Sequence, residues 1–372
     1  MALPTAEVVA LWPRPNHINP ETHGPANVIV ELLLLSIASV ILAIRLYTRS
    51  RISKGFGKDD VLIFIAYAPA TTFVIIEVVA HHRLDRDRHT WDVRPHLAAP
   101  SLQVGLVEQI LFATATGFTK LSILALIYRV VTAAPTPKSR NITRHIVVFT
   151  SVVVVLDAFV FIVVSLIQCR PLSDVWTITT EPQQCIDQGV HLLVASILNT
   201  VQDFVIVFLP IPTVLSLNLP LAQRATVILL FGGGFLVCIA GAVRTHLTWI
   251  FVTRQDGDIN WYTYDMMLAS AVELFLGITC ASIPATKPFF ALYLPCQRLG
   301  SSTEQRRRKK IHIYIIRDLD DDNKALYNPV QYQPEVSRLT YDNNRVRKPP
   351  ANLNKPLPDL SSIFTIPFTV RL

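Results

Sequence analysis

Seven long apolar segments alternate with short polar connections between residues 26 and 293. A helix that crosses the hydrocarbon layer of a membrane needs about 20 mainly apolar residues, and each segment reaches that length. Pro or Gly occurs in many of the connections, as is common where helices end. The pattern predicts an all-α fold, a bundle of seven transmembrane helices. The expected spans are 26–48, 60–80, 103–130, 145–167, 190–216, 225–252 and 266–293.

Polar segments lie on both sides of this apolar region. Residues 1–25 are rich in Pro and lack the basic start and continuous apolar core of a signal peptide, so the first span is expected to direct insertion itself. We therefore expect an extracytoplasmic N-terminal segment (1–25), a seven-helix membrane domain (26–294) and a cytosolic tail (295–372). The tail is rich in Pro, Asn and Asp, a composition typical of mostly disordered chain.

Basic residues mark the side of the membrane on which each connection lies. The connection after the first span carries Arg49 and Arg51, the third carries Lys138 and Arg140, and the tail contains RRRKK at 306–310. Connections rich in Lys and Arg stay in the cytosol. The N-terminus is therefore expected outside and the C-terminus inside. The outer connection at 81–96 opposes this trend with four arginines, which its three aspartates partly offset.

Composition supports a membrane protein and argues against a nucleic-acid-binding protein. Charged residues make up 16% of the chain, whereas soluble proteins carry about 25%. Mean hydropathy is +0.40. The net charge of +7 lies mainly in residues 297–372, which hold 14 Lys and Arg against 8 Asp and Glu. A basic tail after an apolar region fits attraction to anionic lipid headgroups, so the lipid bilayer is the expected partner and nucleic acid is not.

Charged residues lie deep inside several of the expected spans, among them Lys120, Asp203, Arg244 and Glu273. Such a group costs several kcal/mol unless it is paired or hydrated, and it therefore indicates a functional site. At about 1.5 Å of rise per residue, Arg244 and Glu273 lie at similar depths on consecutive helices, which predicts an ion pair. Lys120 either reaches Asp203 or extends to the cytosolic headgroups.

A second group of charges lies at the cytosolic helix ends, formed by Arg45, Arg49, Asp59 and Asp60. Two interpretations are open. The aspartates either cap the helix that starts near residue 60 and suit its dipole, or pair with the arginines and fix the inner ends of the first two helices.

The expected outer face contains an aromatic loop and two cysteines. His89, Trp91 and Asp92 could form a lid over the bundle, although tryptophans near the membrane boundary commonly serve as anchors. Cys169 and Cys185 lie in one outer connection. An oxidising compartment favours a disulfide between them, and the alternative is two free thiols.

Several of these stretches together resemble one protein family. They are RLYTR (45–49), DD (59–60), RHTWDV (88–93), KLSILALIYR (120–129), CRPL…W…C (169–185), NTVQDFVIVFLPIP (199–212), Arg244 and E…ASIPATKPF (273–289). In this order they resemble the fungal rhodopsin-like seven-helix family, which includes membrane proteins of mycotoxin clusters, such as the satratoxin cluster, and receptor-like proteins. The resemblance implies a fungal membrane protein and does not assign an activity.

No cofactor, metal site or catalytic residue is expected. Retinal needs a lysine in mid-membrane, typically in the last helix, and Lys287 lies near the cytosolic end of that helix. The chain has no P-loop, no H-E-x-x-H and no G-x-S-x-G motif. A non-enzymatic role is therefore favoured.

Three functions compete. The favoured one is a receptor-like protein, more plausibly of the plasma membrane than of internal membranes, that senses a small molecule or a surface cue and acts on a cytosolic signalling partner. The second is an accessory enzyme or carrier of a secondary-metabolite or mycotoxin cluster. The third is a structural protein whose charge pairs fix helix register.

Overall fold

The computed structural model describes most of the chain up to Tyr293. Everything described belongs to one compact unit, residues 1–299. The expected tail, 295–372, and the end of the fifth expected span, 212–216, lie outside the described residues. The described residues are 8, 10–53, 55–132, 137–177, 183–211, 221–254 and 257–293.

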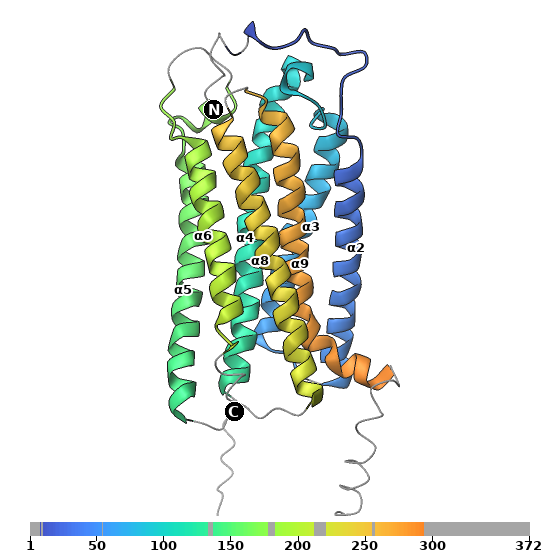
Figure 1. Ribbon diagram of the computed structural model, residues 1–372, viewed down its shortest axis with the longest axis vertical. Coiled ribbons are helices and arrows are strands. Elements are labelled where there is room, and N and C mark those ends of the chain that lie inside the picture. The colour runs from blue at the N-terminus through green and yellow to red at the C-terminus, as the bar shows by residue number, and fades with distance from the viewer. Residues whose placement is uncertain are drawn as a thin grey trace, which may run out of the picture. The chain divides into compact units, whose positions relative to one another are not determined.

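Seven helices that are long and apolar enough to cross a membrane run side by side (Figure 1), so the prediction of an all-α seven-helix bundle is confirmed. Within the described ranges the structure contains isolated β-bridges and no β-strand. The helices are α2 (Ala26–Tyr47), α3 (Lys58–Arg83), α4 (Pro95–Thr132), α5 (Pro137–Ile167), α6 (Gln188–Phe208), α8 (Leu221–Thr253) and α9 (Ile259–Tyr293). A π-helical turn, η1 (Thr48–Ile52), extends α2.

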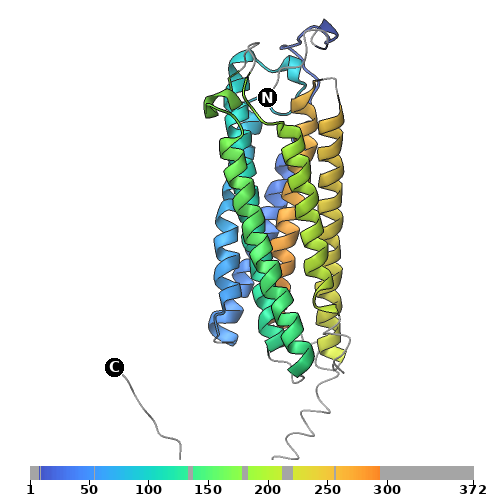
Figure 2. The ribbon, with the colours of Figure 1, turned by 90° about the vertical axis from the view of Figure 1, so that its left-hand side faces the viewer.

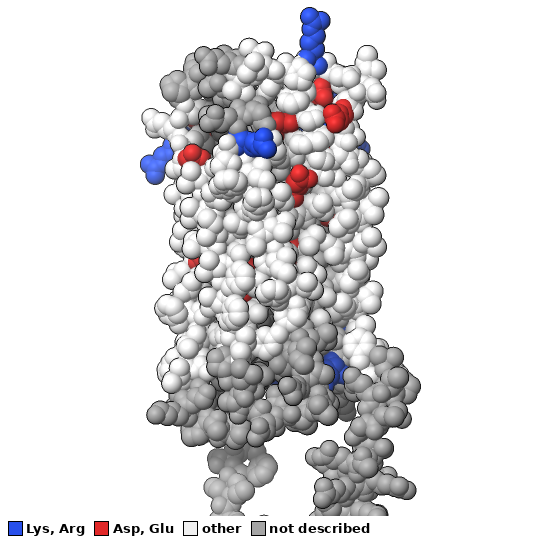
Figure 3. Space-filling view, viewed as in Figure 1, with Lys and Arg blue, Asp and Glu red and all other residues white. Residues whose placement is uncertain are grey.

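We call the end of the bundle that carries the disulfide the outer end and the opposite end the inner end, following the orientation expected from the sequence. The face in Figure 3 is mostly uncharged through its middle, and most of its charged side chains gather near the outer end. This distribution suits a bundle surrounded by hydrocarbon.

Four helices begin at least four residues earlier than the hydrophobic pattern predicts. Two of them begin at the inner end: α5 at Pro137 rather than at residue 145, and α8 at Leu221 rather than at 225. The other two, α4 and α9, begin at the outer end. α4 begins at Pro95 rather than at residue 103, and α9 begins at Ile259 rather than at 266. Pro95 suits the first position of a helix, because that backbone nitrogen needs no intrahelical acceptor. Both helices therefore extend beyond their apolar segments into the outer polar layer. α9 also continues through Pro284 and Pro288, and its last turns angle away from the bundle in Figure 1.

α9 is the central helix of the bundle. It packs against α2, α3, α4 and α8. In its most apolar stretch of 18 residues 72% of the residues are buried, against 17% in the corresponding stretch of α5. Its residues Leu274, Phe275 and Ile278 join Ile63 and Phe73 of α3 in the main apolar core. A substitution or displacement on α9 therefore alters its packing against four other helices.

Glycines allow α8 to approach its neighbours closely. A Cβ atom on Gly233 would lie 2.6 Å from Cys280 Sγ, and one on Gly234 would lie 2.7 Å from Val207 Cγ2. Small residues permit such backbone approach between membrane helices. The glycines thereby hold α8 against α9 and α6.

Loops cover the outer end. The N-terminal segment pairs with the connection after α3 through His23 N, which donates to Asp87 O at 2.9 Å. Cys169 and Cys185 form a disulfide in the connection between α5 and α6, which also holds a short 3₁₀ helix, η3 (Leu172–Val175), so the predicted disulfide is confirmed. A second 3₁₀ turn, η2 (Thr90–Asp92), lies between α3 and α4.

Candidate functional site

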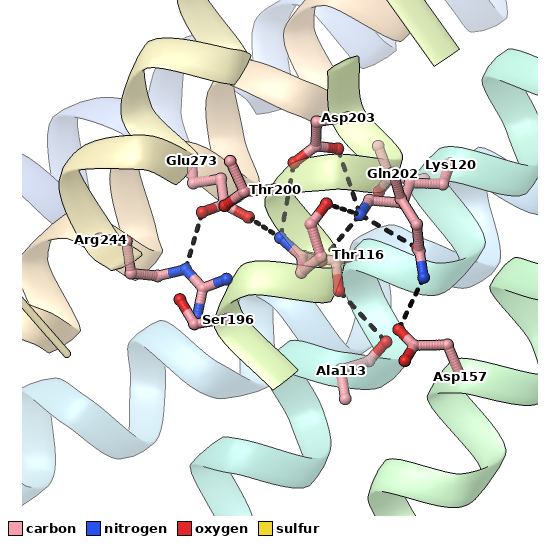
Figure 4. A network of polar contacts seen from close by, with 12 residues as sticks. Ala113, Thr116, Lys120, Asp157, Ser196, Thr200, Gln202, Asp203, Arg244 and Glu273 are labelled. Atoms are coloured by element: carbon pink, nitrogen blue, oxygen red, sulfur yellow. Dashed lines mark hydrogen bonds and ion pairs between the residues drawn. The ribbon is translucent and has the colours of Figure 1, made fainter. Parts of the chain in front are cut away.

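Lys120 of α4 turns into the bundle toward α6 (Figure 4). Its ammonium group donates to the backbone oxygen of Asn199 at 2.7 Å and to Asn199 Oδ1 at 2.8 Å, and it lies 3.2 Å from Asp203 Oδ1. Asn199 and Asp203 share one face of α6 because they are one helical turn apart. Lys120 is 5% exposed, so it does not extend to the headgroups.

Asn199 connects the lysine to a second charge pair. Its Nδ2 donates to Glu273 Oε1 of α9 at 2.6 Å, and Glu273 Oε2 accepts from Arg244 Nε of α8 at 2.7 Å. The expected Arg244–Glu273 contact is thus present (Figure 4), and the amide of Asn199 joins it to Lys120. Four helices meet in this chain of contacts.

A third carboxylate enters from α5. Asp157 Oδ2 accepts from Gln202 Nε2 at 2.8 Å, and Gln202 Oε1 lies 3.4 Å from Lys120 Nζ. Two cationic and three acidic side chains are therefore joined by two amides. We call this group the central polar network: Lys120, Asp157, Asn199, Gln202, Asp203, Arg244 and Glu273.

A small cavity adjoins the central polar network on its outer side. It measures about 80 Å³ and is lined by Gln109, Lys120, Asn199 and Arg244, among others. Arg244 Nη2 and Gln109 Oε1 are buried there and have no hydrogen-bond partner among the described residues. Buried polar atoms are normally paired. The cavity therefore offers one free donor and one free acceptor to a small polar group.

A larger vestibule of about 680 Å³ lies at the outer end. Trp91, Leu102, Val175 and Phe251 are among its mostly apolar lining residues. Ligand pockets typically measure about 300–1,000 Å³ and are apolar with a few polar groups. The vestibule and the small cavity adjoin each other, because they share four lining residues: Gln109, Leu192, Met266 and Met267.

Two residues of the expected lid, His89 and Trp91, lie together at the outer end, and Trp91 lines the vestibule. The ring of His89 stacks on Trp91 at 4.6 Å and on Trp261 at 3.8 Å between ring centroids. His89 Nδ1 lies 2.6 Å from Asp258 Oδ2, a partner that the sequence does not indicate. Asp92 Oδ1 accepts a hydrogen bond from Asn16 N of the N-terminal segment at 2.7 Å.

Three buried glutamates surround one arginine beside the vestibule. Arg86 Nη1 lies 2.7 Å from both Glu77 Oε2 and Glu108 Oε2. Burial lowers the pKa of Arg86, but the two carboxylates outweigh it and raise the pKa above its ordinary value. Glu31 of α2 is fully buried near this group, and neither of its carboxylate oxygens has a partner in the described structure.

The aspartates at the inner end take part in both of the contacts that the sequence left open, helix capping and pairing with the arginines. Arg45 Nε and Nη2 donate to Asp60 at 2.8 Å and Asp59 at 2.9 Å, and Asp60 also accepts from Gly57 N at 2.9 Å, which caps α3. Arg45 Nη1 donates to the backbone oxygen of Ala281 on α9 at 2.7 Å. Arg49 and Arg129 approach Asp59 at 3.3 and 3.5 Å. We call this the inner charge cluster: Arg45, Arg49, Asp59, Asp60 and Arg129.

The family model for the fungal rhodopsin domain matches residues 44–292. The chain belongs to the fungal rhodopsin domain family. It is an integral membrane protein that crosses the bilayer several times. The central polar network lies entirely within the matched range, whereas Glu31 precedes it.

Curated relatives of this fungal rhodopsin-domain protein cover similar shares of the chain. A SAT4 family membrane protein of Emericella nidulans is 23% identical over 69% of this chain and 73% of its own length. A wortmanamides biosynthesis cluster protein C of Talaromyces wortmannii is 25% identical over 73% of both chains. A receptor, GIN3, of Arthrobotrys oligospora is 22% identical over 70% of this chain and 61% of its own length.

Several members of these polar groups have no clear signal in the sequence. Asn199 and Gln202 are amides, and nothing in the hydrophobic pattern separates them from amides that face solvent. Arg86 lies in a connection whose path is set by tertiary contacts. No arrangement of three or more His, Cys, Asp or Glu side chains suitable for a metal ion occurs in the part of the chain that the structure describes.

Proposed function

We propose that this chain is a receptor-like protein of the plasma membrane that binds a small molecule in the outer vestibule. Binding shifts the helices joined by the central polar network, and the inner ends of those helices act on a cytosolic signalling partner. The single observation that carries the proposal is that the vestibule and the small cavity adjoin each other at Gln109 and Met266.

The lining suggests an amphiphilic, uncharged ligand. Its apolar body fits among Leu102, Val175 and Phe251, and one small polar group reaches the small cavity. That group would accept from Arg244 Nη2 and donate to Gln109 Oε1, the two unpartnered buried atoms. An anionic group is disfavoured there, because Arg244 is already paired with Glu273 and the network has one more acidic than cationic side chain.

Binding at this site has a direct route to the helices. Arg244 and Glu273 join α8 to α9, and Asn199 joins both to α6 and α4. A ligand that binds Arg244 Nη2, which has no partner among the described residues, adds a contact at the end of this chain. Differential contact of that kind is what shifts an equilibrium between two conformations.

A thermal-shift screen on the purified chain tests binding. Compounds that bind raise the unfolding temperature, since a ligand that prefers the folded state stabilises it. Gln109→Leu should remove or strongly reduce the shift, whereas Gln103→Leu should keep it. Gln103 is the matched control because it lies on the same helix, is exposed and does not line the small cavity.

Signalling provides the second test. A ligand found in the screen should trigger a response in cells that carry the wild-type chain, and Asp203→Asn or Glu273→Gln should abolish it in protein that still reaches the membrane. Normal signalling in both variants would reject a part for the central polar network in signalling and leave it a structural role.

The second candidate is an accessory protein of secondary metabolism, acting as an enzyme or a carrier. It is supported by relatives whose names refer to wortmanamides and fugralins biosynthesis clusters. Deleting the gene and profiling metabolites separates the two. A stalled intermediate supports an enzyme, retained end product supports a carrier, and unchanged metabolites with a lost response support the receptor.

A further inference from the structure

A long groove lies at the inner end of the bundle, away from the vestibule and the central polar network. It measures about 790 Å³ and is bounded by α3, α4 and α5. Its apolar lining includes Leu62 of α3, Leu121 and Leu124 of α4, and Val152 and Val155 of α5.

The groove exists because α3 and α5 both pack on α4 but separate from each other toward the inner end. Figure 2 shows α5 running obliquely across this face, so that its inner end lies away from that of α3. Small side chains, Ala125 and Ser151, line the space between them. The Ser151 hydroxyl donates to the backbone oxygen of Val147 at 2.8 Å, so it does not need a polar partner from inside the groove.

The groove is open to the surroundings of the bundle. Val152, Val155 and Leu156 line it and are 52%, 50% and 55% exposed. In a chain that crosses the membrane, apolar side chains exposed at this depth face acyl chains. The groove is therefore accessible to lipid from the side.

Cationic groups lie at the polar end of the groove. Lys58 and Arg129 both line it; Lys58 is exposed, and the Arg129 side chain is 51% exposed. Asp59 also lines the groove, but its carboxylate contacts Arg45, Arg49 and Arg129. The inner charge cluster holds three arginines against two aspartates, and Lys58 adds another positive charge. The polar end is therefore net positive.

We propose that this groove binds an anionic glycerophospholipid, with one acyl chain along α4 between α3 and α5 and the phosphate at Lys58 and Arg129. Ammonium and guanidinium groups bind phosphate through charge-assisted hydrogen bonds. The expected orientation places this end in the cytosolic leaflet, where anionic lipids are enriched. The site is independent of the receptor role, because it shares no lining residue with the vestibule or the small cavity.

Native mass spectrometry of the purified full chain tests the site. Detergent micelles would be titrated with phosphatidylserine or with phosphatidylcholine of the same acyl chains. Phosphatidylserine should bind about tenfold more tightly, and Lys58→Gln should remove most of that difference. Ser151→Leu fills the groove and should weaken both lipids.

Two matched variants control for general effects. Arg51→Gln removes an exposed cation at the same end that does not line the groove, and Ser36→Leu adds the same bulk at an exposed position on α2. Both should bind lipid as the wild type does. Equal binding of the two lipids by the wild type, or an equal loss in Arg51→Gln and Lys58→Gln, would overturn the proposal. So would unchanged binding in Ser151→Leu.

Discussion

The amide of Asn199 donates through Nδ2 to Glu273 Oε1 at 2.6 Å, and on its other side Oδ1 accepts from Lys120 Nζ at 2.8 Å. One side chain thus joins two charge pairs that would otherwise be separate. Buried polar groups joined in this way depend on each other, because each lost partner leaves another group unpaired.

Asn199→Leu should destabilise the folded chain by about 2 kcal/mol, since Glu273 and Lys120 each lose a buried hydrogen bond. Chemical unfolding in detergent micelles measures the loss. Ile197→Leu is the control, because Ile197 on the same helix is 45% exposed. Equal stability of Asn199→Leu and the wild type would show that the two charge pairs do not need the amide.

A double-mutant cycle on Lys120 and Asp203 should show strong coupling. Lys120→Met leaves a buried carboxylate without its cation, and Asp203→Asn leaves a buried ammonium without its anion. Either change alone should cost about 3–5 kcal/mol. The double variant should be more stable than the sum of the single losses implies, because no unpaired charge remains. Additive losses would mean that the 3.2 Å contact contributes little.

Glu31→Gln should be tolerated or should stabilise the chain. Both oxygens of Glu31 are buried without a hydrogen-bond partner, so a neutral amide of the same shape breaks no hydrogen bond and leaves Arg86 its contacts with Glu77 and Glu108. Glu77→Gln is the contrasting variant. Glu77 binds Arg86 at 2.7 Å, so the loss of its charge should destabilise the folded chain. Thermal unfolding of the two variants compares them. A similar loss in both would mean that Glu31 has a counter-charge in solution.

His23 should make the outer end sensitive to acid. Its ring stacks on Tyr264 at 4.3 Å between centroids and contacts Trp261 at 3.6 Å with the ring planes tilted by 33°. Burial lowers the pKa of His23 from 6.5, against the opposing charge of Asp265. The unfolded chain therefore binds a proton more readily below about pH 6.5, and stability falls as the pH drops through that range.

His23→Phe keeps the aromatic stacking and removes the titrating group. The unfolding temperature of the wild type should fall more between pH 7 and pH 5 than that of the variant. His96→Phe serves as the control, since His96 is exposed. Parallel curves for wild type and His23→Phe would contradict the expectation.

The hydrophobic pattern predicts the seven helices well, because membrane insertion imposes the same length and composition on every span. Depth along consecutive helices also suffices to bring Arg244 and Glu273 together. The starts of α4 and α9 differ from prediction, since their first turns lie in a polar layer where apolar composition is not required.

The sequence does not predict the contacts that are made through loops and neutral amides. His89 meets Asp258 across the outer end, and Arg86 returns from a connection to Glu77 and Glu108. These positions depend on how loops fold over the bundle, and no spacing rule expresses that path. The role of Asn199 is equally hard to predict from the sequence, because it depends on which charged side chains surround the amide in the folded chain.

The bond from Arg45 Nη1 to the backbone oxygen of Ala281 limits how α9 can move. A displacement of the whole inner half of α9 relative to α2 would have to break a bond between a buried guanidinium and the main chain. A displacement that preserves the bond is confined to the residues after Ala281. That segment carries Pro284 and Pro288, whose missing N–H groups make the helix easier to bend. The easiest place for α9 to bend therefore lies beyond its contact with Arg45, near the inner surface of the membrane domain.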